Sequence, residues 1–220
     1  MPSIAGSCEI GLAMITSKKE LGFYIKADRI MNGLAPEPTL KEKVSNLVLA
    51  TPPVMKYIVA MRKVSYYQHK GGIVNKLKYL WNYHRYNRLS ALLGVFVAPD
   101  VCGYGLVIPH HGTLRIGGGN KIGNYAVIHT VSNMTASKVV AGDGLYMSVG
   151  CKVIGPLTLG NNVSIAANSV VNKSYGDNVL LAGAPAKAVR EDYAPWYERD
   201  GETFVNRVKR VEALKQQMGL

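Results

Sequence analysis

The amino-acid sequence predicts a mainly β protein in which a coil of parallel β-strands over residues 95–189 is flanked by helices on both sides. Three observations predict this architecture. Residues 95–189 repeat with a period of six, residues 1–94 contain helix-start signals, and the last run of the chain is amphipathic at helical spacing. We therefore expect an N-terminal helical domain over 1–94, a β-helix domain over 95–189 and a C-terminal helical extension over 190–220.

Two N-terminal stretches have the pattern of a capping box, in which a hydroxyl and a carboxylate three residues later satisfy backbone N–H groups at a helix start. They are Ser17–Glu20 and Thr39–Glu42. Further helices are predicted over about 54–67 and 74–93. The last of these places four large side chains on one face, where we expect them to pack: Leu77, Leu80, Trp81 and His84.

The central repeat alternates an apolar lead residue with a small neighbour. A period of two would indicate ordinary strands and a period of 3.6 a helix, whereas a period of six indicates short strands joined by similar tight corners. The lead side chain is expected to point into a narrow core, and its small neighbour to turn the corner, where a Cβ would often clash. The lead positions are Ile116, Ile122, Ile128, Ala141, Met147, Val153, Leu159, Ile165 and Val171.

One interval departs from this period. Ile128 and Ala141 are thirteen residues apart, which is two repeats and one additional residue. We therefore expect a bulge or protruding loop within 131–139. After the coil, an amphipathic helix is predicted over 204–218, which either folds back along the coil or joins a neighbouring subunit.

The composition restricts the class of protein. The chain has 220 residues, is 48% hydrophobic and has no apolar run near the ~20 residues of a membrane span. Its start lacks the pattern of a secretory signal, and Cys8, Cys102 and Cys151 lack disulfide or metal-ligand spacing, so a cytoplasmic location is expected. Residues 1–94 carry 14 basic and 5 acidic side chains, but no nucleic-acid-binding motif accompanies this charge.

Three of the five histidines lie close together at the start of the coil. His110 is six residues before Ile116 and therefore in register with the lead positions. His111 and His129 are eighteen residues apart, so with three repeats per turn we expect them at equivalent corners of adjacent coils. Because buried imidazoles need hydrogen-bond partners, a functional role is a better interpretation than packing for at least one of them.

The segment around these histidines resembles the hexapeptide-repeat acyltransferases, in particular the serine O-acetyltransferases and related O-acetyltransferases of polysaccharide biosynthesis. The resemblance extends over 103–189 and rests on GLVIPH at 105–110, IGNYAVIHTV at 122–131, VIGPLTLGNNVSIAANSVV at 153–171 and AGAPAK at 182–187. It implies a three-sided left-handed β-helix, an acetyl-CoA-dependent transfer to a hydroxyl group, a homotrimer and no metal.

The resemblance also implies roles for individual residues. His110 matches the general base of the family, and His111 and His129 are expected to shape the acceptor pocket. In the family, coenzyme A lies between neighbouring subunits. The residues expected to line its pantetheine arm, with a lysine that could meet its phosphates, are Ser148, Val149, Ala166, Ala167, Ala184 and Lys187.

The chain departs from the serine acetyltransferase pattern at three places. Val95 occupies the position of the aspartate that orients the catalytic histidine, and Asp100 is the nearest upstream carboxylate and our candidate for that role. Pro109 replaces an acidic residue, and the His-Pro that follows the loop in the family is absent. The acceptor is therefore L-serine or a sugar hydroxyl of a polysaccharide precursor.

Two other functions remain open at this point. The spacing of His111 and His129 is also compatible with a zinc hydratase resembling the γ-class carbonic anhydrases, because a catalytic zinc needs three protein ligands. That family's pair of histidines five residues apart is missing, however. The second alternative is a non-catalytic assembly module, in which the repeat only supplies a trimeric scaffold.

Overall fold

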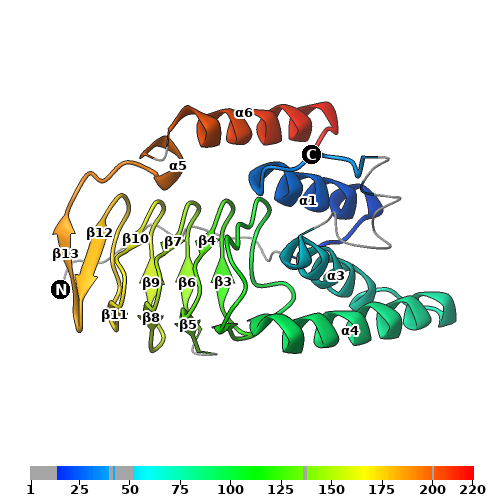
Figure 1. Ribbon diagram of the computed structural model, residues 1–220, viewed down its shortest axis with the longest axis horizontal. Coiled ribbons are helices and arrows are strands. Elements are labelled where there is room, and N and C mark those ends of the chain that lie inside the picture. Colours follow the sequence, from blue (N-terminus) through cyan, green and yellow to red (C-terminus); the bar gives the residue numbers. More distant parts are fainter. Residues whose placement is uncertain (1–13, 40–41, 43–51, 136–137, 200) are drawn as a thin grey trace.

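A computed structural model describes residues 14–39, 42, 52–135, 138–199 and 201–220. The strands form a left-handed parallel β-helix of about five turns, with helices packed at its N-terminal end and along one side (Figure 1). The expected fold class is confirmed. Within the described residues, no helix is long and apolar enough to cross a membrane.

Three sheets form the faces of the prism. The first contains β1 (Val95–Val97), β2 (Leu114–Ile116), β5 (Asn133–Met134), β8 (Lys152–Val153) and β11 (Val170–Val171). The second contains β4 (Val127–Ile128), β7 (Tyr146–Met147), β10 (Ser164–Ile165), β12 (Leu180–Gly183) and the antiparallel β13 (Ala186–Arg190). The third contains β3 (Lys121–Ile122), β6 (Val140–Ala141) and β9 (Thr158–Leu159).

The lead residues of the repeat form the core of the prism. Every predicted lead side chain is at most 1% exposed, and Met134 occupies the same kind of position. Each is the last residue of a short strand. Because the coils stack, the inward-facing side chains of each coil are buried by those of its neighbours. The period of six therefore predicted the core correctly.

The small residues after the lead positions are required by the close approach of neighbouring coils. A Cβ at Gly142 would lie 2.9 Å from the backbone nitrogen of Asn161 in the next coil. The backbone there cannot move without disturbing the ladder, in which Gly142 N–H donates to the carbonyl of Leu159. Glycine is thus selected at this corner by space.

We expect Gly142→Ala to lower the free energy of unfolding by about 1–3 kcal/mol, the usual cost of overpacking a closely packed site. Urea denaturation monitored by circular dichroism measures it. Gly118→Ala is the matched control, because its Cβ would meet only Ala98, at an ordinary 3.8 Å. Equal stability of the two variants would show that the corner tolerates a methyl group.

The irregular interval contains one inserted residue, as predicted. From β3 to β11 successive strands start six residues apart, except that β5 and β6 start seven apart, at Asn133 and Val140. The register with the following coil accordingly changes from eighteen to nineteen residues. Residues 136–137 of this segment lie outside the described residues.

The first N-terminal helix begins where its capping box predicts. Ser17 caps α1 (Lys18–Met31), with reciprocal bonds between Ser17 and Glu20. Thr39 and Glu42 make the same reciprocal bonds, but most of the helix expected after them lies outside the described residues. The next two helices are α3 (Pro53–Gln68) and α4 (Ile73–Leu93), which pack against each other.

The expected inner face of α4 is wrong. Leu77 and Trp81 are 62% and 72% exposed, and Leu80 and His84 are exposed as well. The helix packs instead through Tyr86, whose ring stacks on Tyr57 of α3 and whose hydroxyl donates to the carbonyl of Val97. Tyrosine provides both apolar area and a hydrogen-bond donor at this junction with the first strand, which leucine does not.

The C-terminal segment folds back on its own chain. After α5 (Trp196–Arg199), α6 (Glu202–Gln217) runs along the prism toward α1, which it contacts (Figure 1). Trp196 is buried, and its indole N–H donates to the carbonyl of Tyr125 in the coil. The apolar face of α6 packs on a cluster from α1 and the first coils, so the helix is paired within the protomer.

Candidate active site

The candidate site follows one edge of the prism, where the chain leaves the second sheet. His129, Ser148 and Ala166 each come directly after a strand of that sheet, and the strands β4, β7, β10 and β12 pair in register. Backbone hydrogen bonds connect these three residues to the following coil. The N–H of His129 donates to the carbonyl of Met147, that of Ser148 to Ile165, and that of Ala166 to Leu181.

The other predicted cofactor residues extend this row. Val149 directly follows Ser148, and Ala167 directly follows Ala166. Both are exposed, Val149 to 43%, whereas Ser148 and Ala166 are partly buried. Ala184 lies in the turn after β12, and Lys187 on β13 is exposed and pairs with Ala182. The structure therefore places the predicted cofactor residues along one edge, in line with His129.

The register expected for His111 and His129 is interrupted before the histidines and resumes after them. In the second sheet, Val107 pairs with Val127, twenty residues further on. After the histidines the spacing is eighteen again, because the Val131 N–H donates to the carbonyl of Thr113. The cause is a longer corner: eight residues separate Val107 from Arg115, but only six separate the equivalent Val127 and Asn133. His110 and His111 are the centre of this longer corner, and both side chains are exposed.

His129 is held by a neighbour on the same edge. Its Nε2 lies 2.9 Å from the hydroxyl of Tyr146 on β7. Two residues later, Val131 adopts a left-handed conformation with a φ of 63°, which a β-branched residue rarely does. The corner at His129 is thus fixed by hydrogen bonding and includes a strained backbone position next to the site.

A cavity of about 220 Å³ adjoins the histidine corner. Its walls come from the corner and from the helical part of the chain: Asn32, Leu34, Pro52, Pro53, Val54, Met55, Ile108, Pro109, His110 and His111. Seven of these ten residues are apolar, and none is acidic. The sequence offered no signal for Asn32 or the helical wall, because their approach to the corner depends on tertiary packing.

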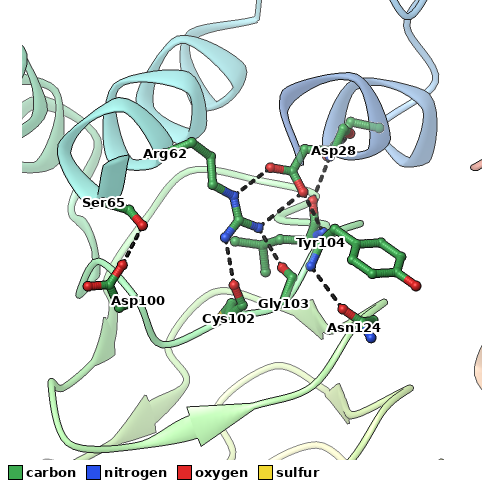
Figure 2. A network of polar contacts seen from close by, with 10 residues as sticks. Asp28, Arg62, Ser65, Asp100, Cys102, Gly103, Tyr104 and Asn124 are labelled. Carbon is green, nitrogen blue, oxygen red and sulfur yellow. Dashed lines mark hydrogen bonds and ion pairs between the residues drawn. The ribbon is translucent and has the colours of Figure 1, made fainter. Parts of the chain in front are cut away.

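Asp100, our candidate for orienting His110, has other partners in the structure. Its carboxylate accepts hydrogen bonds from Ser65 (Figure 2) and Gln68, and lies 2.7 Å from Nε2 of His69. All three belong to α3 or its C-terminal end. The structure therefore joins Asp100 to α3, and the contacts described for it do not include His110.

The two cysteines of the described chain are unsuited to nucleophilic catalysis. Burial raises the pKa of the Cys102 thiol to about 12 and that of the Cys151 thiol to about 11, so both stay protonated near neutral pH. Cys8 lies outside the described residues. Among the residues that the structure describes, no group of three His, Cys, Asp or Glu side chains is arranged to hold a metal ion.

Comparison with known proteins finds relatives among the serine acetyltransferases. No protein-family model matches it. The serine acetyltransferase of Buchnera aphidicola subsp. Acyrthosiphon pisum (strain APS) is 23% identical over 201 residues, which cover 84% of this chain and 72% of that protein. This match covers more residues than the coil and the C-terminal extension together contain. It therefore includes residues of the N-terminal helices as well as the histidine corner.

The chain is similar to the serine acetyltransferases, which are hexapeptide-repeat transferases. Solved structures of serine acetyltransferases share its fold. The serine acetyltransferase of Neisseria gonorrhoeae superposes with a TM-score of 0.55 at 20% identity, covering 81% of this chain and 69% of that one. A serine acetyltransferase solved in complex with CoA gives a TM-score of 0.52 at 18% identity, covering 78% and 69%. The likeness in fold therefore extends beyond the coil, into a region where no sequence motif predicted it.

Proposed function

We propose that this acyltransferase moves an acetyl group from acetyl-CoA to a hydroxyl of a small acceptor, with His110 as general base. The observation that supports this most is the position of His110. It is the histidine of the family motif, it is exposed at an enlarged corner, and it lines the cavity described above.

The chemistry requires a base at this corner. A hydroxyl is too weak an acid to attack a thioester unaided at neutral pH, so the imidazole accepts its proton as the oxygen–carbon bond forms. The carbon–sulfur bond then breaks, and the imidazolium returns the proton to the departing thiolate. Backbone N–H groups can stabilise the oxyanion between these steps, and no covalent enzyme intermediate is needed.

The edge from Ser148 to Lys187 is our proposed site for coenzyme A. Its small side chains leave the backbone accessible to the pantetheine arm, and the ammonium of Lys187 is available to a phosphate. The serine acetyltransferase solved with CoA has the same fold. We propose that two such edges meet in a homotrimer, with the cofactor between neighbouring protomers, and that the enzyme is cytoplasmic.

The acceptor is expected in the cavity between the helical wall and the corner, where His111 and His129 would contact it. L-serine carries an ammonium group that would need a carboxylate partner, and the described lining supplies none. A neutral acceptor, such as a sugar hydroxyl of a polysaccharide precursor, fits this lining better than serine does. The zinc hydratase and the assembly module are not favoured by the relatives.

A screen of acceptors tests the proposal. Purified protein with acetyl-CoA should release free thiol, measured with a chromogenic disulfide, when a hydroxyl acceptor is added and not in its absence. L-Serine, other amino acids and nucleotide sugars form the panel. Release with none of them would count against the transferase. Stoichiometric zinc in the purified protein, with hydration activity, would favour the hydratase instead.

A further inference from the structure

A buried ion pair joins the helices to the first coil. Arg62 on α3 and Asp28 on α1 face each other with Nε and Oδ2 2.8 Å apart, and their side chains are 2% and 0% exposed (Figure 2). Removing two charges from water is costly, so such a pair persists only where further hydrogen bonds satisfy the remaining polar atoms. Those bonds are made to the backbone of residues 102–106.

Three side chains hold this short segment at four backbone atoms. The guanidinium of Arg62 donates to the carbonyls of Cys102 and Gly103, each at 2.6 Å (Figure 2). Asp28 Oδ1 accepts the N–H of Leu106 at 2.9 Å, and Asn32 Nδ2 donates to the Leu106 carbonyl at 2.8 Å. Both polar backbone groups of Leu106 are therefore held by side chains at the C-terminal end of α1.

The fastened segment leads directly into His110. Leu106 and Ile108 are buried in the core, and Val107 between them pairs with Val127. Only Pro109 then separates this anchored stretch from the base. Because the intervening side chains are closely packed, a shift at Leu106 would be transmitted to the histidine corner rather than absorbed.

We propose that Asp28, Asn32 and Arg62 are positioning residues, through which α1 and α3 fix the place of His110 relative to the cofactor edge. This inference rests on the proposed role of His110. A base moved by about 1 Å can lose up to about 100-fold in rate. The helical part of the chain is thus part of the catalytic arrangement, as well as a cover for the end of the prism.

Asn32 gives the sharpest test, because it is uncharged and partly exposed. Its amide makes two bonds, one to the Asp28 carbonyl in its own helix and one to Leu106. Asn75 on α4 makes only the first kind, to the carbonyl of Gly71 four residues earlier. Asn75→Ala is therefore a matched control for Asn32→Ala that leaves the fastened segment intact.

The variants are compared by amide hydrogen exchange without substrate and by steady-state kinetics. Asn32→Ala should speed exchange over 104–111 and lower kcat by about tenfold, with KM for acetyl-CoA within about twofold of wild type. Asn75→Ala should change neither. Faster exchange with an undiminished kcat would overturn the positioning role, and so would unchanged exchange over 104–111.

A second variant separates positioning from stability. Asp28→Leu with Arg62→Met removes both charges, so no unpaired ion remains buried, but it also removes three of the four bonds to 102–106. A folded double variant should still lose about tenfold or more in kcat, and full activity would contradict the proposal. If wild type transfers no acetyl group, the proposed function fails. Amide hydrogen exchange over 104–111 then tests by itself whether the three side chains hold this segment.

Discussion

His110→Ala should lower kcat for acetyl transfer by about 10²–10⁴-fold, the usual contribution of a positioned general base. The side chain is exposed at the corner and fills no core, so the variant should fold normally. Coenzyme A should still bind, because the proposed cofactor residues from Ser148 onward are unchanged. Thiol release at saturating acetyl-CoA and acceptor gives kcat, and calorimetry gives the affinity for coenzyme A.

His84→Ala is the control for that experiment. His84 is also an exposed histidine, but it lies on α4 and away from the cavity lining. We expect its kcat to be indistinguishable from that of wild type. A His110→Ala enzyme that keeps most of its turnover would remove the proposed base from the mechanism, whatever the acceptor is.

The largest expected effect on stability comes from Arg62→Ala. The variant leaves the Asp28 carboxylate buried without its partner, and breaking a buried pair in this way costs about 3–5 kcal/mol. It also leaves the carbonyls of Cys102 and Gly103 without their donors. Urea denaturation should show this loss, and Arg85→Ala on the exposed side of α4 should stay within about 0.5 kcal/mol of wild type.

The stability lost in Arg62→Ala should depend on pH. Burial raises the pKa of the Asp28 carboxyl above its ordinary value, and the charge of Arg62 opposes that rise. Without Arg62 the folded chain should bind a proton at Asp28 more readily than the unfolded chain does. The deficit should therefore shrink as the pH falls toward the ordinary carboxyl pKa. A deficit that grows on acidification, or none at all, would contradict a buried, charge-paired Asp28.

The coil could be predicted because its cause is local and repeated. Each lead residue is buried, and each close corner requires a small residue. Every turn of the prism therefore has the same sequence pattern. The single insertion before Val140 was visible for the same reason. The helix start at Ser17 and the reciprocal bonds of Thr39 and Glu42 were also predictable, since a capping box lies entirely within four residues.

The orientation of α4 could not be predicted from periodicity. Leu77, Leu80 and Trp81 are on one face, as expected, but that face is exposed in the protomer. The helix is instead held by polar-tipped aromatic side chains at its junction with β1. Hydrophobic spacing identifies a stripe, but it does not show which surface of the chain the stripe meets.

The candidate site was partly predictable. The motif identified His110, and the structure places the predicted cofactor residues along one edge with His129. The enlarged corner around His110 was not predicted, because it adds two residues that a fixed period of eighteen does not include. Asp28, Asn32 and Arg62 were missed because their contacts with 102–106 join residues 40 to 78 positions apart.

A structure of the protein bound to coenzyme A tests the central claim most directly. We predict that the pantetheine arm follows the edge from Lys187 toward His129 and ends with its sulfur beside the His110 imidazole, at a boundary between two protomers. Coenzyme A bound on another face, or a His110 ring directed away from the sulfur, would contradict it.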